Sequence, residues 1–534
     1  MQVEGFEAED LEDFNYKVEN KKLEDHLNSF PAADGWRETS IQIPLPCEGE
    51  SWPSEGEAPH LEVDGIFYRP LLEVVVGLFQ GENAKTFHMT PFKQFWQRSP
   101  DVEPERLYSE IYTSDAMLEA DEEFHNIQLT PGDGPDVPRV VAAMMGSSDE
   151  TQLANFGPAS LWPGYIQSGN QTKYVRCRPT CHACQHVLYM KKLPTDFQDI
   201  YTREHGIPAS AAVLTHCKRE LFHAIWMLLL DEEFMHAYHH GVVVMCGNGI
   251  VRRIFPRFFT YSADYPEKVI LASIKHLGAC PCPRCIVPKD QIKDLGKTVD
   301  INRHERNTRV STDIERRVVE KARKMIFEKG VPVNSARIDV VLGGKGLLPN
   351  VFATCLGPSG FNHYRMLTND LLHEFELGVW KNTFIHLLRL LFAMGGTRVN
   401  ELNKRFHNTP AFGRETIRPF THNTSAMKQL AARNFEDILQ VCTNSSSLDL
   451  GLLLTLQTFS VLSPCSRGFL FPTTSQTIMS TTKLSWISFS ISAPGMGMRR
   501  CASTRKLQSP PFALSLNLSA LPSDGFNPRR ASIG

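Results

Sequence analysis

The sequence lacks long hydrophobic runs, a secretory signal and an even framework of cysteines. Its longest apolar stretch lies near Ala224–Leu230, far short of the roughly 20 residues that a helix needs to cross a bilayer. Met1 is not followed by a basic and then an apolar segment, and the thirteen cysteines are unevenly spaced. These absences argue against a membrane-spanning or secreted, disulfide-stabilised protein. They favour reduced thiols, with clustered cysteines binding metal.

A strong overall charge is also lacking, because the formal net charge is −3 over 534 residues. Residues 1–60 hold fifteen Asp and Glu against four Lys and Arg, a balance of −11, so the remainder carries +8. A mildly basic body is compatible with nucleic-acid binding but does not require it. No HExxH motif occurs, which argues against a zinc hydrolase of that type.

The two ends of the chain lack the periodicity of packed structure. Residues 1–61 are acidic, and we expect them to be largely disordered. Residues 443–534 contain 27 Ser or Thr, no Glu, and only Asp449 and Asp524 as acids. We expect this tail not to fold, and we favour an aberrant reading frame over a low-complexity linker. The folded body is therefore predicted to span 62–442.

Within this body, apolar patterns predict both strands and long helices. Buried strands are expected at 139–145 and 241–246, and a longer strand at 250–261 should pair with the second across 247–249. Apolar residues at three-to-four spacing predict helices at 209–239, 312–329, 371–394 and 425–441. The pattern indicates an α/β core with many added helices.

The segment FPRFFTYSADYPEKVILASIKHLGACPCPRC, residues 255–285, carries the clearest chemistry. Its aromatic and β-branched run ends at a lone carboxylate, Asp264, and Cys282 and Cys285 follow two residues apart. A carboxylate at a strand end can hold a hard cation such as Mg²⁺, and paired thiolates can hold Zn²⁺. The combination suggests a metal-dependent nucleic-acid enzyme with a structural zinc site.

This segment and several others resemble a known family. They include GIFYRPLLEVV, ERLYSEIYTSDAM, LANFGPASLWPGYI and DLLHEFELGVWK, from near Gly65 to near Gln440. The chain is similar to the Plavaka-type transposases of fungal genomes, which are relatives of the CACTA transposases. The resemblance implies an α/β fold: an RNase H-like mixed sheet, within about 139–442, with large, mainly helical insertions and a structural zinc knuckle.

The resemblance also implies a function and a set of partners. A transposase of this kind would cleave phosphodiesters at transposon ends and join the 3′-OH to target DNA. It would use two Mg²⁺ or Mn²⁺ ions held by three carboxylates. We accordingly expect a nuclear protein that binds transposon ends and target DNA and acts as a homo-oligomer.

Two of the three catalytic acids follow from the strand ends and the family's motifs. Asp149 follows the 139–145 run in an SDxT-like motif, and Asp264 follows the 250–261 run. By spacing alone, a turn or N-cap role is the better interpretation of Asp149, and an Asp-Tyr-Pro turn is the alternative for Asp264; the resemblance favours the catalytic role for both. The third acid stays open. The segment 370–376 offers Asp370, Glu374 and Glu376, whereas a later helix offers Glu436 and Asp437; we favour Glu436 and Glu376 equally.

An inactive remnant is the alternative function. Relatives tend to carry Asp where this chain has Asn434, and a neutral amide cannot offset the charge of two divalent cations. Residues 1–60 also contain no Cys/His finger of the kind that relatives use to recognise DNA ends. The chain would then be a non-catalytic DNA-binding or structural descendant of a transposase.

The resemblance further implies ligands for zinc and contacts for DNA. Cys282 and Cys285 would bind structural Zn²⁺ with a distant histidine, His373 by preference and His363 next. Three arginines flank the Asp264 strand and could contact phosphates, although a solvated strand edge would explain them as well. They are Arg252, Arg253 and Arg257.

Overall fold

The structure is a computed structural model, and it describes most of the predicted body. The described residues are 18, 35–128, 132, 134–152, 160–295, 297–343, 349–411, 417–426 and 432–444. The predicted tail, 443–534, therefore lies outside the described residues apart from its first two.

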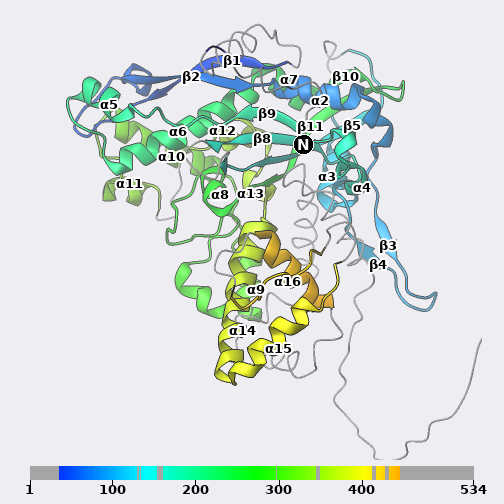
Figure 1. The fold of residues 1–534 in the computed structure, drawn as a ribbon. Coiled ribbons are helices and arrows are strands. Elements are labelled where there is room, and N and C mark those ends of the chain that lie inside the picture. The colour runs from blue at the N-terminus through cyan, green and yellow to red at the C-terminus, as the bar shows by residue number, and fades with distance from the viewer. Residues whose placement is uncertain are drawn as a thin grey trace, which may run out of the picture.

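One mixed, eight-stranded sheet organises the chain (Figure 1). Strand β5 runs parallel to β11, and β11 runs parallel to β12, whereas the other pairings are antiparallel. The predicted strand at 139–145 and the predicted hairpin at 241–261 are confirmed as β5 and as β10 with β11. The order across the sheet is β1 (Arg37–Pro44), β2 (His60–Tyr68), β9 (Gln185–Tyr189), β8 (Pro163–Ser168), β5 (Arg139–Ser148), β11 (Val251–Ser262) and β10 (Val242–Met245), with β12 (Leu367–Thr368) beside β11.

Helices surround this sheet, and the long helices predicted from the sequence are present, although the 209–239 and 371–394 stretches each divide into two. The α-helices are α2 (Leu71–Gln80), α3 (Asp115–His125), α4 (Lys173–Arg176), α5 (Phe197–His205), α6 (Ala211–Leu229), α7 (Glu232–His240), α8 (Tyr265–Leu271), α9 (Thr298–Arg306), α10 (Asp313–Phe327), α11 (Ala336–Val341), α12 (Val351–Cys355), α13 (His363–Met366), α14 (Lys381–Ala393), α15 (Gly396–His407) and α16 (Ala432–Asn444).

Shorter elements complete the chain, and one of them is a π-helix that leads into α14. The π-helix is η8 (Leu371–Trp380). The 3₁₀ turns are η2 (Glu55–Glu57), η3 (Glu82–Thr86), η4 (Ile111–Thr113), η5 (Pro179–Cys181), η6 (Lys289–Asp294) and η7 (Gly357–Ser359). Two small hairpins are β3 (Gln94–Trp96) with β4 (Glu105–Leu107) and β6 (Thr151–Gln152) with β7 (Ser160–Leu161).

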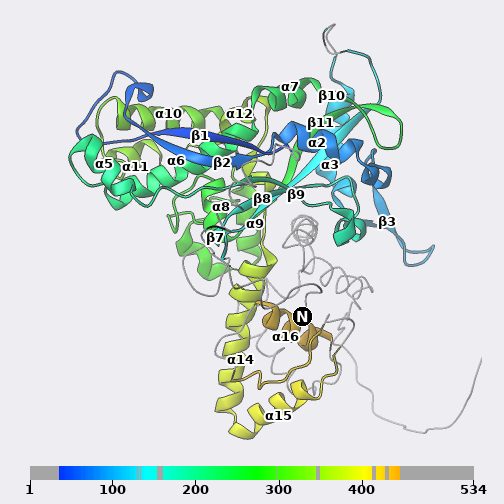
Figure 2. The same ribbon diagram turned by 45° about the horizontal axis from the view of Figure 1, so that its top comes forward.

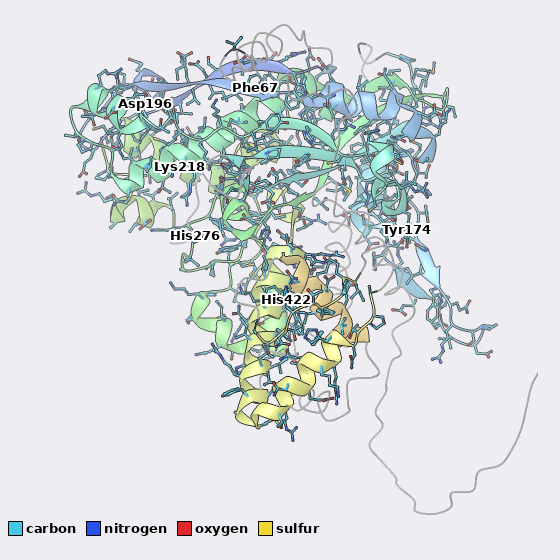
Figure 3. The ribbon with its side chains drawn as sticks, viewed as in Figure 1. Phe67, Tyr174, Asp196, Lys218, His276 and His422 are labelled. Atoms are coloured by element: carbon cyan, nitrogen blue, oxygen red, sulfur yellow. The ribbon has the colours of Figure 1, made fainter. Side chains whose placement is uncertain are left out.

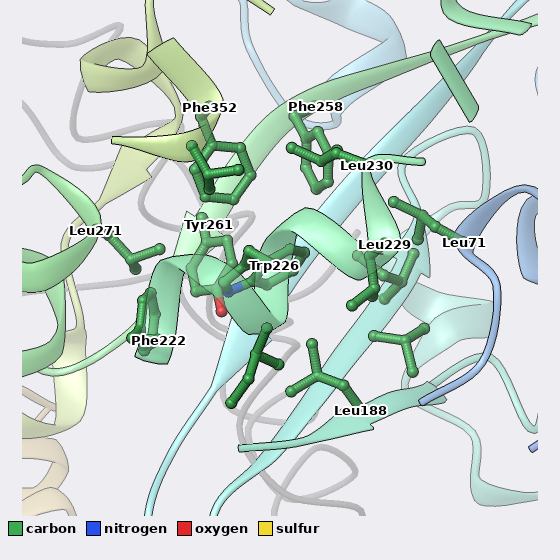
Figure 4. Close-up of a cluster of buried hydrophobic side chains, with 14 of the residues drawn as sticks. Leu71, Leu188, Phe222, Trp226, Leu229, Leu230, Phe258, Tyr261, Leu271 and Phe352 are labelled. Carbon is green, nitrogen blue, oxygen red and sulfur yellow. The ribbon is translucent and has the colours of Figure 1, made fainter. Parts of the chain in front are cut away.

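The centre of the sheet is buried on both faces, which explains why β5 reads as a continuous apolar run. On one face, Trp226 of α6 packs 5.5 Å from the Tyr261 ring and 5.2 Å from Phe352 (Figure 4). On the other, Phe124 of α3 stacks on Phe255 at 4.6 Å. Each such side chain contributes roughly 1.5–3 kcal/mol through burial, so β5 and β11 are rigidly held.

Helices α14, α15 and α16 form an arm that extends away from the sheet (Figures 1 and 2). The arm has its own apolar cluster, which includes Trp380, Phe384, Phe406 and Ile438. Figure 3 locates His422 in this arm and Lys218 on α6 in the main body. The described residues contain no helix that is long and apolar enough to span a membrane.

The prediction that residues 1–61 lack packed structure is wrong from Arg37 onward. Strand β1 pairs with β2, and Ile41 and Ile43 are buried while the intervening Gln42 is exposed. This two-residue alternation is typical of a strand with one buried face. The acidic residues of the segment dominate its overall composition, and the short alternation of β1 does not change that composition.

Candidate active site

Three aspartates lie where three parallel strands end. Asp149 directly follows β5, whereas Asp264 and Asp370 each come two residues after the ends of β11 and β12. In the sheet register, Ser262 of β11 lies opposite both Ser147 and Thr368. Because parallel neighbours end at the same edge, the fold brings all three acids to one side of the sheet.

Two of these aspartates also cap helices, which fixes their positions. Asp264 accepts a hydrogen bond from the Glu267 backbone N–H at 2.9 Å and begins α8. Asp370 accepts from Leu372 N at 2.9 Å and begins η8. The capping interpretation and the functional one are therefore compatible: each cap holds one carboxylate oxygen in place while the backbone anchors it to the strand end.

Asp149 feels the charges of Asp264, Asp370 and His373. Burial raises the pKa of Asp149, and the negative charges of Asp264 and Asp370 raise it further, whereas His373 opposes them. The Nδ1 of His373 lies 2.5 Å from Asp370 Oδ2. This hydrogen bond raises the pKa of His373, and the charges of Asp149 and Asp264 add to the effect. The strand ends therefore present three carboxylates and one imidazole on the same side of the sheet.

A buried polar network lies directly beneath this cluster. Glu267 accepts from Trp162 Nε1 at 3.0 Å and is hydrogen-bonded to Ser148, whose hydroxyl lies 2.6 Å from Tyr261 OH. Burial raises the pKa of Glu267 to about 8. Glu267 is therefore protonated at neutral pH, and the network joins the last residue of β5 to α8 without adding another charge.

An ion pair connects the same helix to the third strand. Lys268 pairs with Glu374 of η8, and its Nζ donates to the Thr368 carbonyl at 3.1 Å. Lys268 is buried, and its contacts fix the relative positions of α8, β12 and η8. The backbone that presents Asp264 and Asp370 is consequently braced from both sides.

Comparison with known proteins agrees with this arrangement. A sequence model of the Plavaka transposase family matches residues 18–388, which is more than half of the chain. The chain belongs to the Plavaka transposase family. The match confirms the resemblance, begins earlier than the motifs near Gly65 suggested, and ends before the segment near Gln440. No curated protein sequence matches the chain.

The Plavaka match includes the three aspartates but ends before Glu436, one of the two acids favoured as the third ligand. Glu436 lies on α16, is 4% exposed and is 2.9 Å from Arg433. Glu376 is 2% exposed within η8, against which α16 packs. The acid that shares electrostatic coupling with Asp149 is Asp370. It was among the residues considered from the sequence but was not favoured.

The arginines expected to contact DNA have structural surroundings in this Plavaka protein. Arg253 is 1% exposed, and its guanidinium donates to the carbonyls of His240 and Pro135, both at 3.0 Å. Arg257 donates to the Tyr238 carbonyl at 2.6 Å, and its guanidinium carbon lies 3.5 Å from the centroid of the Tyr238 ring. Buried guanidiniums bonded to backbone carbonyls cannot reach phosphates without breaking these bonds.

Arg252 has a similar environment at the start of the same strand. It is 8% exposed and donates to Asn248 Oδ1 at 2.8 Å, across the β10–β11 turn. The three arginines therefore stabilise the hairpin and its packing, and their contact with phosphates stays a prediction from the sequence.

The thiol pair has a histidine neighbour that the sequence did not indicate. Cys285 Sγ lies 3.0 Å from His304 Nδ1, and His304 Nε2 lies 3.4 Å from Asp300. Cys282, Asp300 and His304 line one cavity. The hydrogen bond from Cys285 lowers the pKa of Cys282. Cys285 and Asp300 thus contact opposite nitrogens of the His304 ring, with Cys282 lining the same cavity as His304.

The two histidines predicted to complete the zinc site lie in other surroundings. His373 is hydrogen-bonded to Asp370 in the aspartate cluster. His363 is 2% exposed, neither ring nitrogen has a hydrogen-bond partner among the described residues, and burial lowers its pKa to about 3. His304 was missed because α9 is polar and its spacing from Cys285 follows no short metal-binding motif.

Proposed function

We propose that this chain is the catalytic region of a DNA transposase that cleaves and joins phosphodiesters at transposon ends. One observation carries the proposal: Asp149, Asp264 and Asp370 stand at the ends of three parallel strands, on one side of the sheet. Membership of the Plavaka family supports DNA as the substrate.

The order of the central strands supports an RNase H-like core. Strand β5 lies between β8, to which it is antiparallel, and β11, to which it is parallel. Asp149 follows the first long central strand, and Asp264 follows the strand that returns parallel beside it. This is the arrangement that the family resemblance implies for the first two acids.

The donor atoms suit a hard divalent cation. Carboxylate oxygens are the ligands that Mg²⁺ and Mn²⁺ prefer, and three like charges in one place favour a cation that reduces their repulsion. When bound, such ions would activate the attacking oxygen and stabilise the leaving one. The chain itself holds the carboxylates on rigid strand ends, while protonated Glu267 and the Lys268–Glu374 pair keep those ends fixed.

A structural zinc site is part of the same proposal. Cys282 and Cys285 would supply thiolates and His304 an imidazole, with Asp300 as the fourth ligand or as the partner of the second imidazole nitrogen. Homo-oligomerisation and a nuclear location belong to the proposal because transposon ends are DNA and are joined in pairs.

The experiment that tests the proposal is nicking of a supercoiled plasmid that carries the genomic DNA flanking the gene. We expect nicking with Mg²⁺ or Mn²⁺, none in chelator, and loss in the Asp264→Asn and Asp370→Asn variants. Binding of Mn²⁺, followed by its electron paramagnetic resonance signal, provides a readout that is independent of activity.

An inactive DNA-binding descendant is the second candidate, and one observation favours it. His373 lies 2.5 Å from Asp370, and this hydrogen bond raises the His373 pKa, which favours an imidazolium that would offset part of the negative charge. Retained DNA binding without Mn²⁺ binding or nicking, in the wild-type protein and in a His373→Gln variant, would support this candidate.

A further inference from the structure

A separate group of metal-binding side chains lies near the N-terminal edge of the sheet. One donor atom from each of Cys47, Glu50 and His205 lies within 4.8 Å of the other two. Cys47 and Glu50 belong to the turn that follows β1, and His205 is the last residue of α5. The three residues share no member with the proposed active site or with the Cys282–Cys285 pair.

His205 is enclosed, yet one of its nitrogens has no protein partner. Its side chain is 0% exposed, and its ring lies 4.5 Å from Tyr201 and 6.2 Å from Trp52. Nδ1 lies 3.0 Å from Glu50 Oε2, whereas the buried Nε2 has no hydrogen-bond partner among the described residues. Buried polar atoms are nearly always paired, so the unpaired Nε2 is a second observation, beside the donor cluster, that points to a ligand of this histidine.

The turn that supplies the other two donors is held in place by backbone hydrogen bonds. Gly49 N donates to the Gly330 carbonyl at 2.9 Å, and Trp52 N donates to the Phe327 carbonyl at 3.0 Å. Gly330 has φ of +62°, and a Cβ at this position would stand 2.6 Å from the Glu50 carbonyl oxygen. The turn therefore docks closely on the end of α10, which positions Cys47 and Glu50 before any ion binds.

We propose that Cys47, Glu50 and His205 bind a Zn²⁺ ion. A thiolate, an imidazole and a carboxylate are the three donor types that zinc accepts, whereas Mg²⁺ and Ca²⁺ avoid sulfur. Around a tetrahedral ion, such donors stand roughly 3.3–3.7 Å apart, so small side-chain rotations within the observed cluster are sufficient. Binding converts the Cys47 thiol to a zinc thiolate and releases its proton to water.

The cluster is reached by solvent from the Glu50 side, since the Glu50 side chain is 42% exposed while that of His205 is 0% exposed and Cys47 is buried. A water molecule would complete the tetrahedron. The ion would join the β1 turn to the end of α5, two segments about 150 residues apart. We therefore assign it a stabilising role at this edge of the sheet.

The test is the zinc content of the purified full-length protein, measured by elemental analysis in a Cys282→Ser/Cys285→Ser background that removes the other thiol pair. We expect one zinc per chain in this background and none after adding Cys47→Ser or His205→Gln. Cys217→Ser is the matched control, since Cys217 is another buried cysteine, on α6, and should leave zinc unchanged. Unchanged zinc in both ligand variants would overturn the proposal.

A second measurement uses the wild-type chain, in case these variants fail to fold. Zinc removal by a chelator should speed alkylation of Cys47 by at least about tenfold, mapped by mass spectrometry, and should leave Cys217 unchanged. Equal Cys47 rates with and without zinc would refute the site. Neither readout depends on DNA cleavage, so the site and the proposed function can fail separately.

Discussion

Strand β11 has arginines near its beginning and an aspartate just beyond its end, and the two kinds of charge have different surroundings. At its beginning, Arg253 is 1% exposed and donates to two backbone carbonyls. Beyond its other end, Asp264 is only partly buried and stands with Asp149 and Asp370, whose like charges oppose one another. The guanidinium at the basic end is bonded to backbone carbonyls within the protein, whereas the acidic end holds carboxylates of like charge on one side of the sheet.

This contrast teaches how to separate structural charge from functional charge. A buried charge whose hydrogen bonds are all made contributes to folding and has little left for a ligand. Like charges that the fold holds together lower stability, and such an arrangement persists where an external ion or substrate uses it. Sign alone does not distinguish the two cases, because basic residues near a transposase strand are expected to meet DNA.

The largest expected effect is at the acidic end. Asp264→Asn retains an oxygen to cap α8 but removes the charge, so metal-dependent plasmid nicking should fall by at least about 10²-fold. The free energy of unfolding should change by less than about 0.5 kcal/mol, since Asn and Asp cap helices equally well. Urea unfolding beside the nicking assay checks both; a nicking rate near wild type would remove Asp264 from the site.

At the basic end, a substitution should lower stability and leave DNA binding unchanged. Arg253→Met keeps the apolar stem but leaves the carbonyls of His240 and Pro135 without their donor, and should cost about 2–4 kcal/mol in urea unfolding. The salt dependence of DNA binding should not change. A stable variant whose log–log salt slope falls by about one would show instead that Arg253 contacts a phosphate.

A smaller effect is expected at Glu267, where the free energy of unfolding should depend on pH in a direction that its raised pKa fixes. Its folded pKa of about 8 exceeds the ordinary 4.5, so the folded state keeps a proton that the unfolded state releases between these values. Wild-type stability should therefore decline as pH rises from about 4.5 to 8. Glu267→Gln, measured by urea unfolding in chelator, should match wild type near pH 5 and exceed it by at least about 1 kcal/mol at pH 8.

Parallel stability curves for wild type and Glu267→Gln would contradict this prediction. They would mean that Glu267 is ionised in the folded protein and adds a fourth charge to the aspartate cluster. Ser148→Ala is a useful companion, because it removes one hydrogen bond to Glu267 without altering the number of titrating groups.

The smallest effect should come from the two acids that the sequence favoured as the third ligand. Glu376→Gln and Glu436→Gln should keep metal-dependent nicking within about threefold of wild type, or about 0.6 kcal/mol in barrier height. Asp370→Asn should cause a much larger loss in the same assay. A loss from Glu436→Gln as large as that from Asp264→Asn would return the third ligand to α16.

The sequence predicts the part of this site that depends on local pattern. Strands β5 and β11 are long apolar runs, and an acid after each is visible without a structure. Asp370 is different, because β12 comprises only Leu367 and Thr368 and pairs through tertiary contact with β11. A two-residue strand leaves no periodicity, so the third strand end could not be recognised.

Partners distant in the chain were likewise beyond reach of spacing rules. His304 meets Cys285 across 19 residues, and His205 meets Glu50 across 155. Their proximity follows from how α9 and α5 pack, which no short motif encodes. The burial of the β11 arginines could not be foreseen for a related reason: a strand's sequence does not reveal which guanidiniums donate to backbone carbonyls.

The π-helix η8, which follows Asp370, contains more residues than an α-helix would need for the same number of turns. A π-helix winds more residues into each turn than an α-helix does, so Leu371–Trp380 could lose a residue and rewind as α-helix between the same two ends. Such a deletion would turn Glu374 and Glu376 to new directions while Asp370, anchored beside β12, stayed in place. In this chain, the stretch could therefore change its length while Asp370 stays beside β12.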